Sequence, residues 1–218
     1  MNPEKMETIG RVIQSFRQRD NVGIKIAGSG GQGVILAGNI LGAASMNANF
    51  NASQMQSYDA ATRGTSVSSD VIISRKGVLN YPVIKKADLL VTFTQTTFDT
   101  LQRKVKPNGI ILADEDLVER TVSKVLVLKL PATRIAQDEI KSKVVANLVM
   151  LGGIVHLLGF LPLQAVEKAM KEILSEHFYK LNMKAFSSGV TRASEIFAID
   201  TTTSSPASSK GDSSRFDD

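Results

Sequence analysis

The sequence of 218 residues contains no cysteine, no tryptophan and only two histidines, His156 and His177. Without cysteine the chain can form no disulfide, supply no thiolate nucleophile and hold no iron–sulfur cluster through its own side chains. Two histidines also leave little material for a histidine-based metal site or a Ser-His-Asp triad. We therefore expect both histidines to be structural, no metal site in this chain, and any redox centre to lie in another chain.

Long apolar runs are also lacking. The runs "VILAG", "KVLVLKL" and "LVMLGGIVHLLGFLPL" are each broken by Gly, Pro or Lys before the roughly 18 apolar residues that a membrane span needs. The first twenty residues carry acidic side chains and lack the apolar stretch and cleavage site of a secretory signal. We expect a cytoplasmic protein that crosses no membrane.

The charge is basic but dispersed. The formal net charge is +5, and the densest basic runs, Lys85-Lys86 and Arg103-Lys104 with Lys106, are short. A basic balance can indicate nucleic-acid binding, which rests here on charge alone. The scatter favours instead a solvated basic face, or one that meets an acidic partner subunit, and we expect no nucleic-acid partner.

Short β-rich segments alternate with helical or looping segments, which is typical of an α/β domain. The pattern predicts a Rossmann-like open sheet with flanking helices in a single domain, residues 21–200. The expected strands are residues 24–27, 49–53, 66–74, 87–94, 110–113 and 122–130. The expected helices are residues 32–46, 98–105, 132–161 with interruptions at Gly152-Gly153 and Gly159, 163–175 and 179–193.

Both ends of the chain differ from this domain. Residues 1–20 place apolar side chains at helical spacing, which predicts an amphipathic helix with one apolar stripe of Met6, Ile9, Val12, Ile13 and Phe16. Residues 201–218, "TTTSSPASSKGDSSRFDD", contain almost no apolar side chains. Such a segment buries too little to offset its ordering entropy, so we expect a disordered tail.

The first motif is a glycine turn, residues 28–33, whose letters "GSGGQG" satisfy G-x-G-x-x-G between an expected strand and an expected helix. Such a turn exposes backbone N–H groups of Gly28, Gly30, Gly31, Gln32 and Gly33 and aims them, with the helix dipole, at an anion. The alternative is that the glycines only allow the helix to pack closely on the sheet.

A dinucleotide site also needs an Asp or Glu about twenty residues further on, to hold the ribose hydroxyls. The chain has no acidic residue between Asp20 and Asp59, and the expected position falls in "NFNASQMQ". The glycine turn therefore favours close packing or the phosphate of a different ligand over NAD or FAD.

The second motif, "SQMQSYDAATRGTSVSSDVIIS", follows the second expected strand as a long polar segment. Tyr58 offers a ring and a hydroxyl group, and Arg63 offers a guanidinium suited to a carboxylate or phosphate. Gly64 lets a neighbouring group approach the backbone. We interpret this segment as a loop that carries binding residues, although an ordinary surface loop often has the same composition.

Several motifs in a fixed order produce a resemblance. The turn "GSGGQGVILAG" is followed by "QSYDAATRG", "SDVIIS", "NYPVIKKADLLVTFTQ" and "PNGIILAD". This series resembles the gamma subunit of the 2-oxoacid:ferredoxin oxidoreductases, most closely the 2-oxoglutarate type, over residues 24–195. The acidic or amide residue that usually precedes the family's Arg-Gly-Gly is replaced here within Ala60-Ala61-Thr62, and the second glycine of that motif is replaced by Thr65. These departures leave the role of the Arg63 loop open.

The resemblance implies a non-catalytic subunit that is inactive alone. It would join alpha and beta subunits, with a delta subunit as a further candidate, in oxidising a 2-oxoacid such as 2-oxoglutarate or pyruvate to its acyl-CoA and reducing ferredoxin. Thiamine diphosphate, Mg and the iron–sulfur cluster would lie in partner subunits, and coenzyme A would be a co-substrate. The residues expected to contact a phosphate of coenzyme A, or a partner chain, are Gly28, Gly30, Gly31, Gln32, Gly33, Tyr58, Arg63 and Gly64. The alternative function is a stand-alone nucleotide-binding domain or small dehydrogenase.

Overall fold

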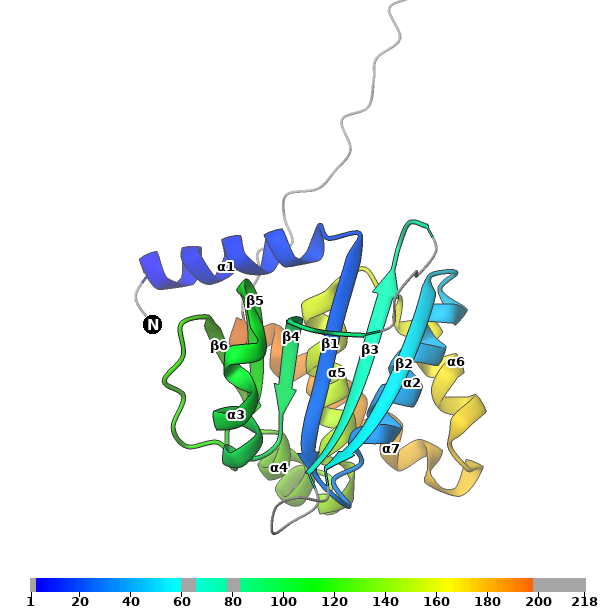
Figure 1. Cartoon of the computed structure of the whole chain (residues 1–218). Helices are drawn as coiled ribbons and strands as arrows, with labels where there is room; N and C mark the ends of the chain where they lie inside the picture. Colours follow the sequence, from blue (N-terminus) through cyan, green and yellow to red (C-terminus); the bar gives the residue numbers. More distant parts are fainter. Residues whose placement is uncertain (1–2, 60–65, 78–82, 198–218) are drawn as a thin grey trace, which may run out of the picture.

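A computed structural model describes residues 3–59, 66–77 and 83–197 as an α/β domain around one mixed sheet (Figure 1). The strand order is β2-β3-β1-β4-β5-β6. The strands are β1 (Asn21–Ser29), β2 (Asn51–Asp59), β3 (Ser66–Ser74), β4 (Ala87–Thr92), β5 (Val105–Asp114) and β6 (Leu126–Leu130). The predicted α/β fold with a Rossmann-like sheet and flanking helices is confirmed.

Seven α-helices accompany the sheet among the described residues. They are α1 (Pro3–Arg17), α2 (Val34–Asn47), α3 (Gln95–Leu101), α4 (Ala132–Arg134), α5 (Ala146–Leu158), α6 (Leu163–Ile173) and α7 (Glu176–Phe197). Short 3-10 segments lie at Gln102–Lys104 and Lys143–Val145, and a π-helical turn lies at Ile135–Glu139. None of the described helices is both long and apolar enough to span a bilayer.

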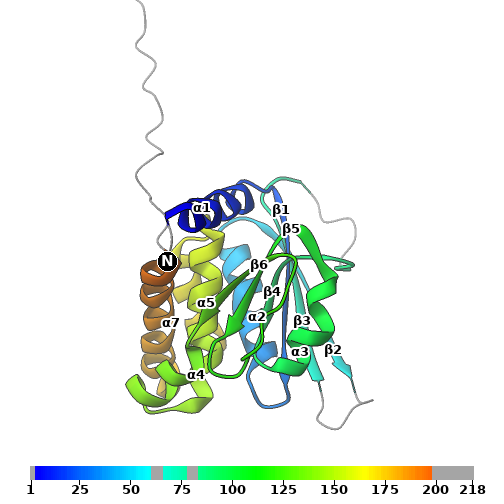
Figure 2. The same ribbon diagram turned by 90° about the vertical axis from the view of Figure 1, so that its left-hand side faces the viewer.

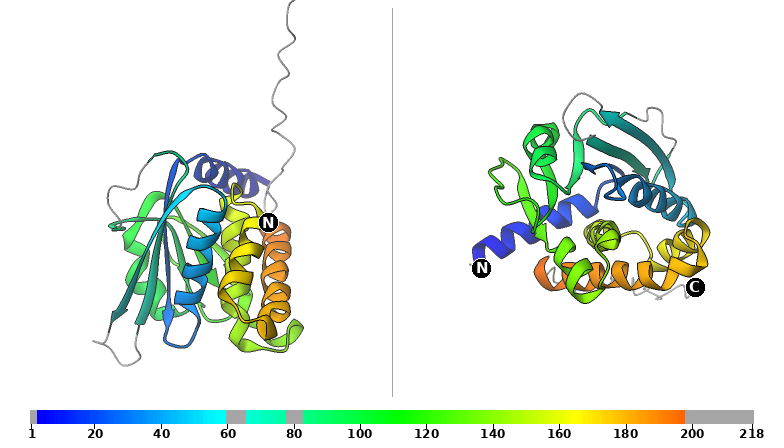
Figure 3. Two further views of the ribbon diagram at one scale, coloured as in Figure 1. Left: turned by 90° about the vertical axis from the view of Figure 1, so that its right-hand side faces the viewer. Right: turned by 90° about the horizontal axis from the view of Figure 1, so that it is seen from below.

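The helices cover the two faces of the sheet unequally (Figures 2 and 3). The helices α2, α5, α6 and α7 lie on one face and enclose the main core, while α3 lies on the other face against β4. Strand β4 is buried on both faces, because Leu89 and Val91 enter the main core and Leu90 enters a second, smaller core with Phe98 of α3. A near-continuous apolar strand is what burial on both faces requires.

The opposite half of this second face, formed by β1, β3 and β2, is polar. Lys25 of β1 and Asp70 of β3 are direct neighbours in the antiparallel register and form an ion pair there. The neighbouring residues Ile24 and Ile26 point to the main core instead, because side chains alternate along a strand. The sheet therefore has an apolar, helix-covered half and a polar half on the same face.

Helix α1 lies across one end of the sheet, as the N-terminal stripe predicts (Figure 1). Ile13 and Phe16 are completely buried and Ile9 is nearly so, all within the main core. The predicted position of Met6 in the stripe lies outside the residues whose side chains are described. The predicted tail, residues 201–218, lies outside the described residues altogether.

Several predicted boundaries are wrong. The long helix expected at 132–161 is broken at 135–145, not at Gly152-Gly153, which lie inside α5. A Cβ at Gly152 would lie 2.6 Å from the backbone nitrogen of Val190, so this glycine lets α7 approach α5 closely. Residues 105–109, outside the strand expected at 110–113, belong to β5, where the pairing with β4 is irregular. Strand β6 begins at Leu126, not at residue 122.

The burial of α1 gives a first prediction. Replacing Ile13 with Asp should lower the free energy of unfolding by about 3–5 kcal/mol, because a buried side chain is lost and a charge must enter the core. Urea unfolding of the isolated chain measures this loss. Gln14→Asp is the control, because Gln14 is exposed on the same helix and should change stability little. Equal stability of the two variants would show that α1 does not contribute to the core.

Candidate functional site

The helices that follow β1 and β4 in the chain indicate where a ligand site is expected. The two strands are parallel neighbours, and the chain leaves β1 for α2 on the main-core face but leaves β4 for α3 on the other face. Adjacent parallel strands whose following helices lie on opposite faces leave a crevice at their carboxyl ends, where open α/β sheets bind ligands. The glycine turn, residues 28–33, lies at this end of β1.

The glycine turn is closed largely by its own atoms. Gly31 and Gly33 have φ angles of 85° and 71°, in the left-handed region that favours glycine. The backbone nitrogen of Gln32 donates to the carbonyl of Ser29 at 3.2 Å, and the Gln32 side chain accepts a hydrogen bond from the Ser29 nitrogen at 2.6 Å. A Cβ at Gly28 would lie 2.6 Å from that same side-chain oxygen. Gln32 therefore occupies the inner side of the turn.

The following helix keeps its N-terminal backbone donors. Gly33 is the N-cap residue of α2 and provides no side-chain cap, and no acidic residue lies in the first turn of α2. The first intrahelical bond runs from the nitrogen of Ala37 to the carbonyl of Gly33, so the N–H groups before it have no helical partner. Together with the helix dipole these donors favour a negatively charged group.

Asn147, the second residue of α5, contacts the turn from inside the protein. Its side-chain nitrogen donates to the carbonyl of Gly33 at 3.1 Å, and a Cβ at Gly33 would overlap that nitrogen. Asn147 is 2% exposed, and its side-chain oxygen has no hydrogen-bond partner among the described residues. Sequence reasoning missed this residue, whose one signal is a polar side chain at the start of the otherwise apolar "NLVMLGGIVHLL".

A cleft of about 450 Å³ opens between α3 and the polar half of the sheet, near the same crevice. Its lining is rich in hydroxyl groups and includes two lysines; it consists of Lys25, Ser57, Tyr58, Ser66, Ser68, Thr96, Thr97, Thr100, Leu101 and Lys104. The glycine turn is not among the described residues that line it. The turn and the cleft are therefore neighbouring features of one sheet edge and do not form a single pocket.

The structure places only part of the predicted site. Gly30, Gly31, Gln32 and Gly33 form the turn, as expected, whereas Gly28 is the last residue but one of β1. The loop interpretation of Tyr58 is wrong, because Tyr58 lies in β2, a strand that continues to Asp59 and pairs with β3 without interruption.

The carboxyl end of β2 points the same way as that of β1, since both strands are antiparallel to β3, and Tyr58 is among the residues that line the cleft. Its register opposite Val67 places its side chain on the face of α2, so Tyr58 lies at the edge between the cleft and that face. Arg63 and Gly64 lie outside the described residues.

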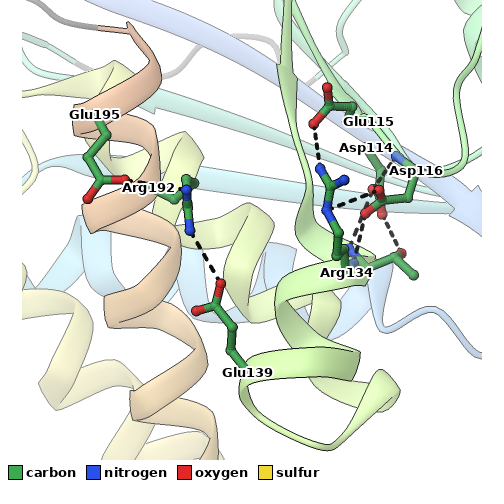
Figure 4. A network of polar contacts seen from close by, with 8 residues as sticks. Asp114, Glu115, Asp116, Arg134, Glu139, Arg192 and Glu195 are labelled. Carbon is green, nitrogen blue, oxygen red and sulfur yellow. Dashed lines mark hydrogen bonds and ion pairs between the residues drawn. The ribbon is translucent and has the colours of Figure 1, made fainter.

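Acidic residues cluster at the carboxyl end of β5, where they form hydrogen bonds and ion pairs with neighbouring residues (Figure 4). Asp114 accepts hydrogen bonds from the Thr133 hydroxyl at 2.6 Å and from the Asp116 nitrogen at 3.2 Å. Arg134 pairs with Glu115 at 3.0 Å. Burial nevertheless raises the pKa of Asp114 above its ordinary value. Within the described residues no group of three or more His, Cys, Asp or Glu could hold a metal ion. The hydrogen bonds from Thr133 to Asp114 and from the Arg134 nitrogen to Asp116 hold the segment after β6 against β5.

Neither histidine lies at the crevice. His177 is exposed and its ring contacts Phe178, with centroids 4.8 Å apart. His156 lies in α5 beside Arg17, whose guanidinium donates to the carbonyl of His156 at 2.7 Å and thereby caps the end of α5. Burial, and next the positive charge of Arg17, lower the pKa of His156 below its ordinary value. The buried position of His156 agrees with a structural role, whereas the role expected for the exposed His177 stays a prediction.

Comparison with known proteins decides the family. The family of pyruvate ferredoxin/flavodoxin oxidoreductases matches residues 23–192. The chain belongs to this family. A 2-oxoglutarate synthase subunit KorC of Methanocaldococcus jannaschii is 40% identical over 177 residues, which cover 79% of this chain and 94% of that protein. The oxidoreductase family thus includes proteins that match this chain over nearly their whole length.

Solved structures of oxidoreductases support the same family assignment. The gamma subunit of a keto/oxoacid ferredoxin oxidoreductase from Geobacter sulfurreducens is 34% identical with a TM-score of 0.70, covering 79% of this chain and 98% of that chain. A 2-oxoglutarate:ferredoxin oxidoreductase from Magnetococcus marinus shares the fold, with a TM-score of 0.72 and 21% identity, covering 82% of this chain and 32% of that chain. The chain is a gamma-type subunit of a 2-oxoacid:ferredoxin oxidoreductase, as its sequence predicts.

The contact between Gly33 and Asn147 gives a second prediction. Gly33→Ala should lower the free energy of unfolding by at least about 2 kcal/mol, because the left-handed backbone and the overlap with Asn147 both oppose a Cβ. Gly42→Ala is the matched control in α2, since no described atom lies within 4 Å of its added Cβ and the helix should gain about 0.5–1 kcal/mol. Thermal unfolding of both variants tests the difference, and a stable Gly33→Ala chain would contradict it.

The buried imidazole gives a third prediction. The unfolded chain takes up a proton on His156 near the ordinary pKa of 6.5, whereas the folded chain does so only at lower pH. Stability should therefore fall as the pH drops below about 6.5, and His156→Leu should flatten this fall. Melting temperatures between pH 7.5 and 5 measure the slope, with His177→Leu as the exposed control. A slope unchanged in His156→Leu would show that another group causes it.

Proposed function

We propose that this chain is the gamma subunit of an oxidoreductase that converts 2-oxoglutarate, coenzyme A and oxidised ferredoxin to succinyl-CoA, carbon dioxide and reduced ferredoxin. The observation that carries the choice of 2-oxoglutarate is that four relatives, 29% to 40% identical, are each a 2-oxoglutarate synthase subunit KorC. Each relative is matched over 86% to 94% of its length. Ketoisovalerate oxidoreductase subunits VorA are also similar, at 31% and 33% identity but over only 37% and 27% of their own length, and a pyruvate/ketoisovalerate common subunit gamma is 28% identical.

The subunit acts with alpha and beta partners that hold thiamine diphosphate, Mg and the iron–sulfur cluster. Support comes from the composition of this chain, which has no cysteine to ligate a cluster. The buried polar groups at the carboxyl end of β5 also have neighbours of their own, as described for Asp114, and offer no free acid–base pair. Ferredoxin receives electrons from the partner subunits, and this chain serves assembly and binding of the co-substrate.

The glycine turn presents backbone donors to a phosphate of coenzyme A. The uncapped start of α2 favours an anion, and no described atom lies within 4 Å of a Cβ built at Gly31. The structure of the Magnetococcus marinus enzyme of the same fold contains coenzyme A. Arg63 supplies a supporting charge, and Tyr58 lies at the same edge of the sheet.

A stand-alone dehydrogenase fits the structure less well. The strand β2 does end in an acidic residue, Asp59, which is the usual place of a ribose ligand. However, β3 lies between β1 and β2, so the end of β2 is two strand spacings, about 10 Å, from the glycine turn and not one. This inserted strand separates the acid from the turn, and we expect no NAD binding by the isolated chain.

The fourth prediction tests the coenzyme A site in the complex assembled from all subunits. Arg63→Ala should raise the KM for coenzyme A about ten- to a hundredfold, because a charge-assisted hydrogen bond is lost. Gly31→Val should do the same by blocking the approach of the phosphate. The KM for 2-oxoglutarate should hardly change, and steady-state kinetics with each substrate varied measure both. His177→Leu is the control for a surface change elsewhere.

Different failures of this experiment have different meanings. If both variants assemble and use coenzyme A as the parent does, the glycine turn is structural and the phosphate proposal is wrong. If the complex is active but oxidises pyruvate in preference to 2-oxoglutarate, the substrate assignment is wrong while the subunit assignment stands. If calorimetry gives a micromolar dissociation constant for NAD with the isolated chain, the subunit reading itself is wrong.

A further inference from the structure

The edge strand β2 lacks the features that protect an exposed sheet edge. It has nine residues and pairs with β3 in one uninterrupted register, so it contains no bulge. From Asn51 to Tyr58 it carries no charged residue and no proline. The opposite edge, β6, is only five residues long and carries Lys129. Short edges, charges, prolines and bulges are the usual means of preventing strand addition, and β2 has none of them over these eight residues.

Large side chains of β2 are also exposed. Tyr58 is 64% exposed and Met55 is 40% exposed. Met55 lies on the polar face of the sheet, opposite Asp70, whereas Tyr58 lies on the face of α2. The outer backbone groups of β2 have no hydrogen-bond partner within residues 3–59, 66–77 and 83–197. Such an edge, with exposed large side chains on both faces, favours the addition of another strand.

The sequence of β2 indicates which strand would fit. Residues 53–57 read "SQMQS", which is the same in both directions. If a second β2 pairs antiparallel with Met55 opposite Met55, then Ser53 lies opposite Ser57 and Gln54 opposite Gln56. The next pair on the face of α2 joins the small Ala52 to the exposed Tyr58. An antiparallel pair related by a two-fold axis requires this kind of self-complementary surface.

We propose that β2 pairs with β2 of a second copy of this chain, which joins the two sheets across a two-fold axis at Met55. The pairing satisfies the free backbone groups of both edges and covers Met55 and Tyr58 in both copies. It leaves the glycine turns at opposite ends of the joined sheet, because the two copies of β1 then run in opposite directions. The inference does not rest on the backbone donors of the glycine turn.

Single cysteines test this pairing directly, since the native chain has none. Directly opposite residues have Cβ atoms about 5 Å apart, so Met55→Cys should form a covalent dimer under mild oxidation or with a short bismaleimide. The control is Val122→Cys, because Val122 is 87% exposed and precedes β6 at the other edge. Ser53→Cys and Ser57→Cys should cross-link when mixed but hardly at all when alone, which fixes the register.

A charge variant tests the same interface without cross-linking. Met55→Lys should raise the dimer dissociation constant of the full chain about tenfold or more in sedimentation equilibrium, because two ammonium groups would meet at the axis. Val122→Lys should leave the constant unchanged. A parent chain that stays monomeric, with no excess cross-linking of Met55→Cys over Val122→Cys, would overturn the proposal. Shielding of Met55→Cys from a thiol reagent only by alpha or beta subunits would also overturn it, in favour of a partner strand.

Discussion

The rest of the structure depends on the close contact between the glycine turn and the start of α5. Gly33 begins α2 in a left-handed conformation and lies against Asn147, which donates to its carbonyl. This contact fixes where α2 leaves the sheet, and α2 in turn lies against β1, β2, β3 and α6. A side chain at Gly33 would move α2 away from all four, so one backbone position sets the spacing of the main core and the shape of the crevice beside it.

Local sequence patterns predicted the elements whose buried or turn-forming residues recur at a regular, short spacing. The stripe of Ile9, Ile13 and Phe16 indicated an amphipathic helix, and the strand expected at residues 87–94 corresponds to β4. The glycines of the turn were recognisable because their spacing between a strand and a helix has a direct backbone cause. Each of these signals spans fewer than a dozen residues, so the sequence alone can express it.

Features that depend on distant pairing could not be predicted in this way. The antiparallel insertion of β3 between β1 and β2 is a matter of topology, and it moves Asp59 and Tyr58 one strand further from the turn. Asn147 meets Gly33 across 114 positions of sequence. The glycines at 152 and 153 suggested a break in the helix, but Gly152 instead lets α7 pack on α5, which only the tertiary contact reveals.

The contacts of the individual glycines distinguish the two roles considered for the glycine turn, close packing of the helix and binding of an anion. Gly28 and Gly33 are bound inward, one against the Gln32 side chain and the other against Asn147, so their lack of side chains serves packing. Gly31 is different, because a Cβ there meets no described atom within 4 Å. Its left-handed backbone opposes a side chain on conformational grounds, although there is space for one. A turn whose inner side is filled, and whose outer side at Gly31 meets no atom of the described residues, can pack a helix and still present its outer donors to a ligand. Packing and anion binding therefore use different residues of one turn and do not exclude each other.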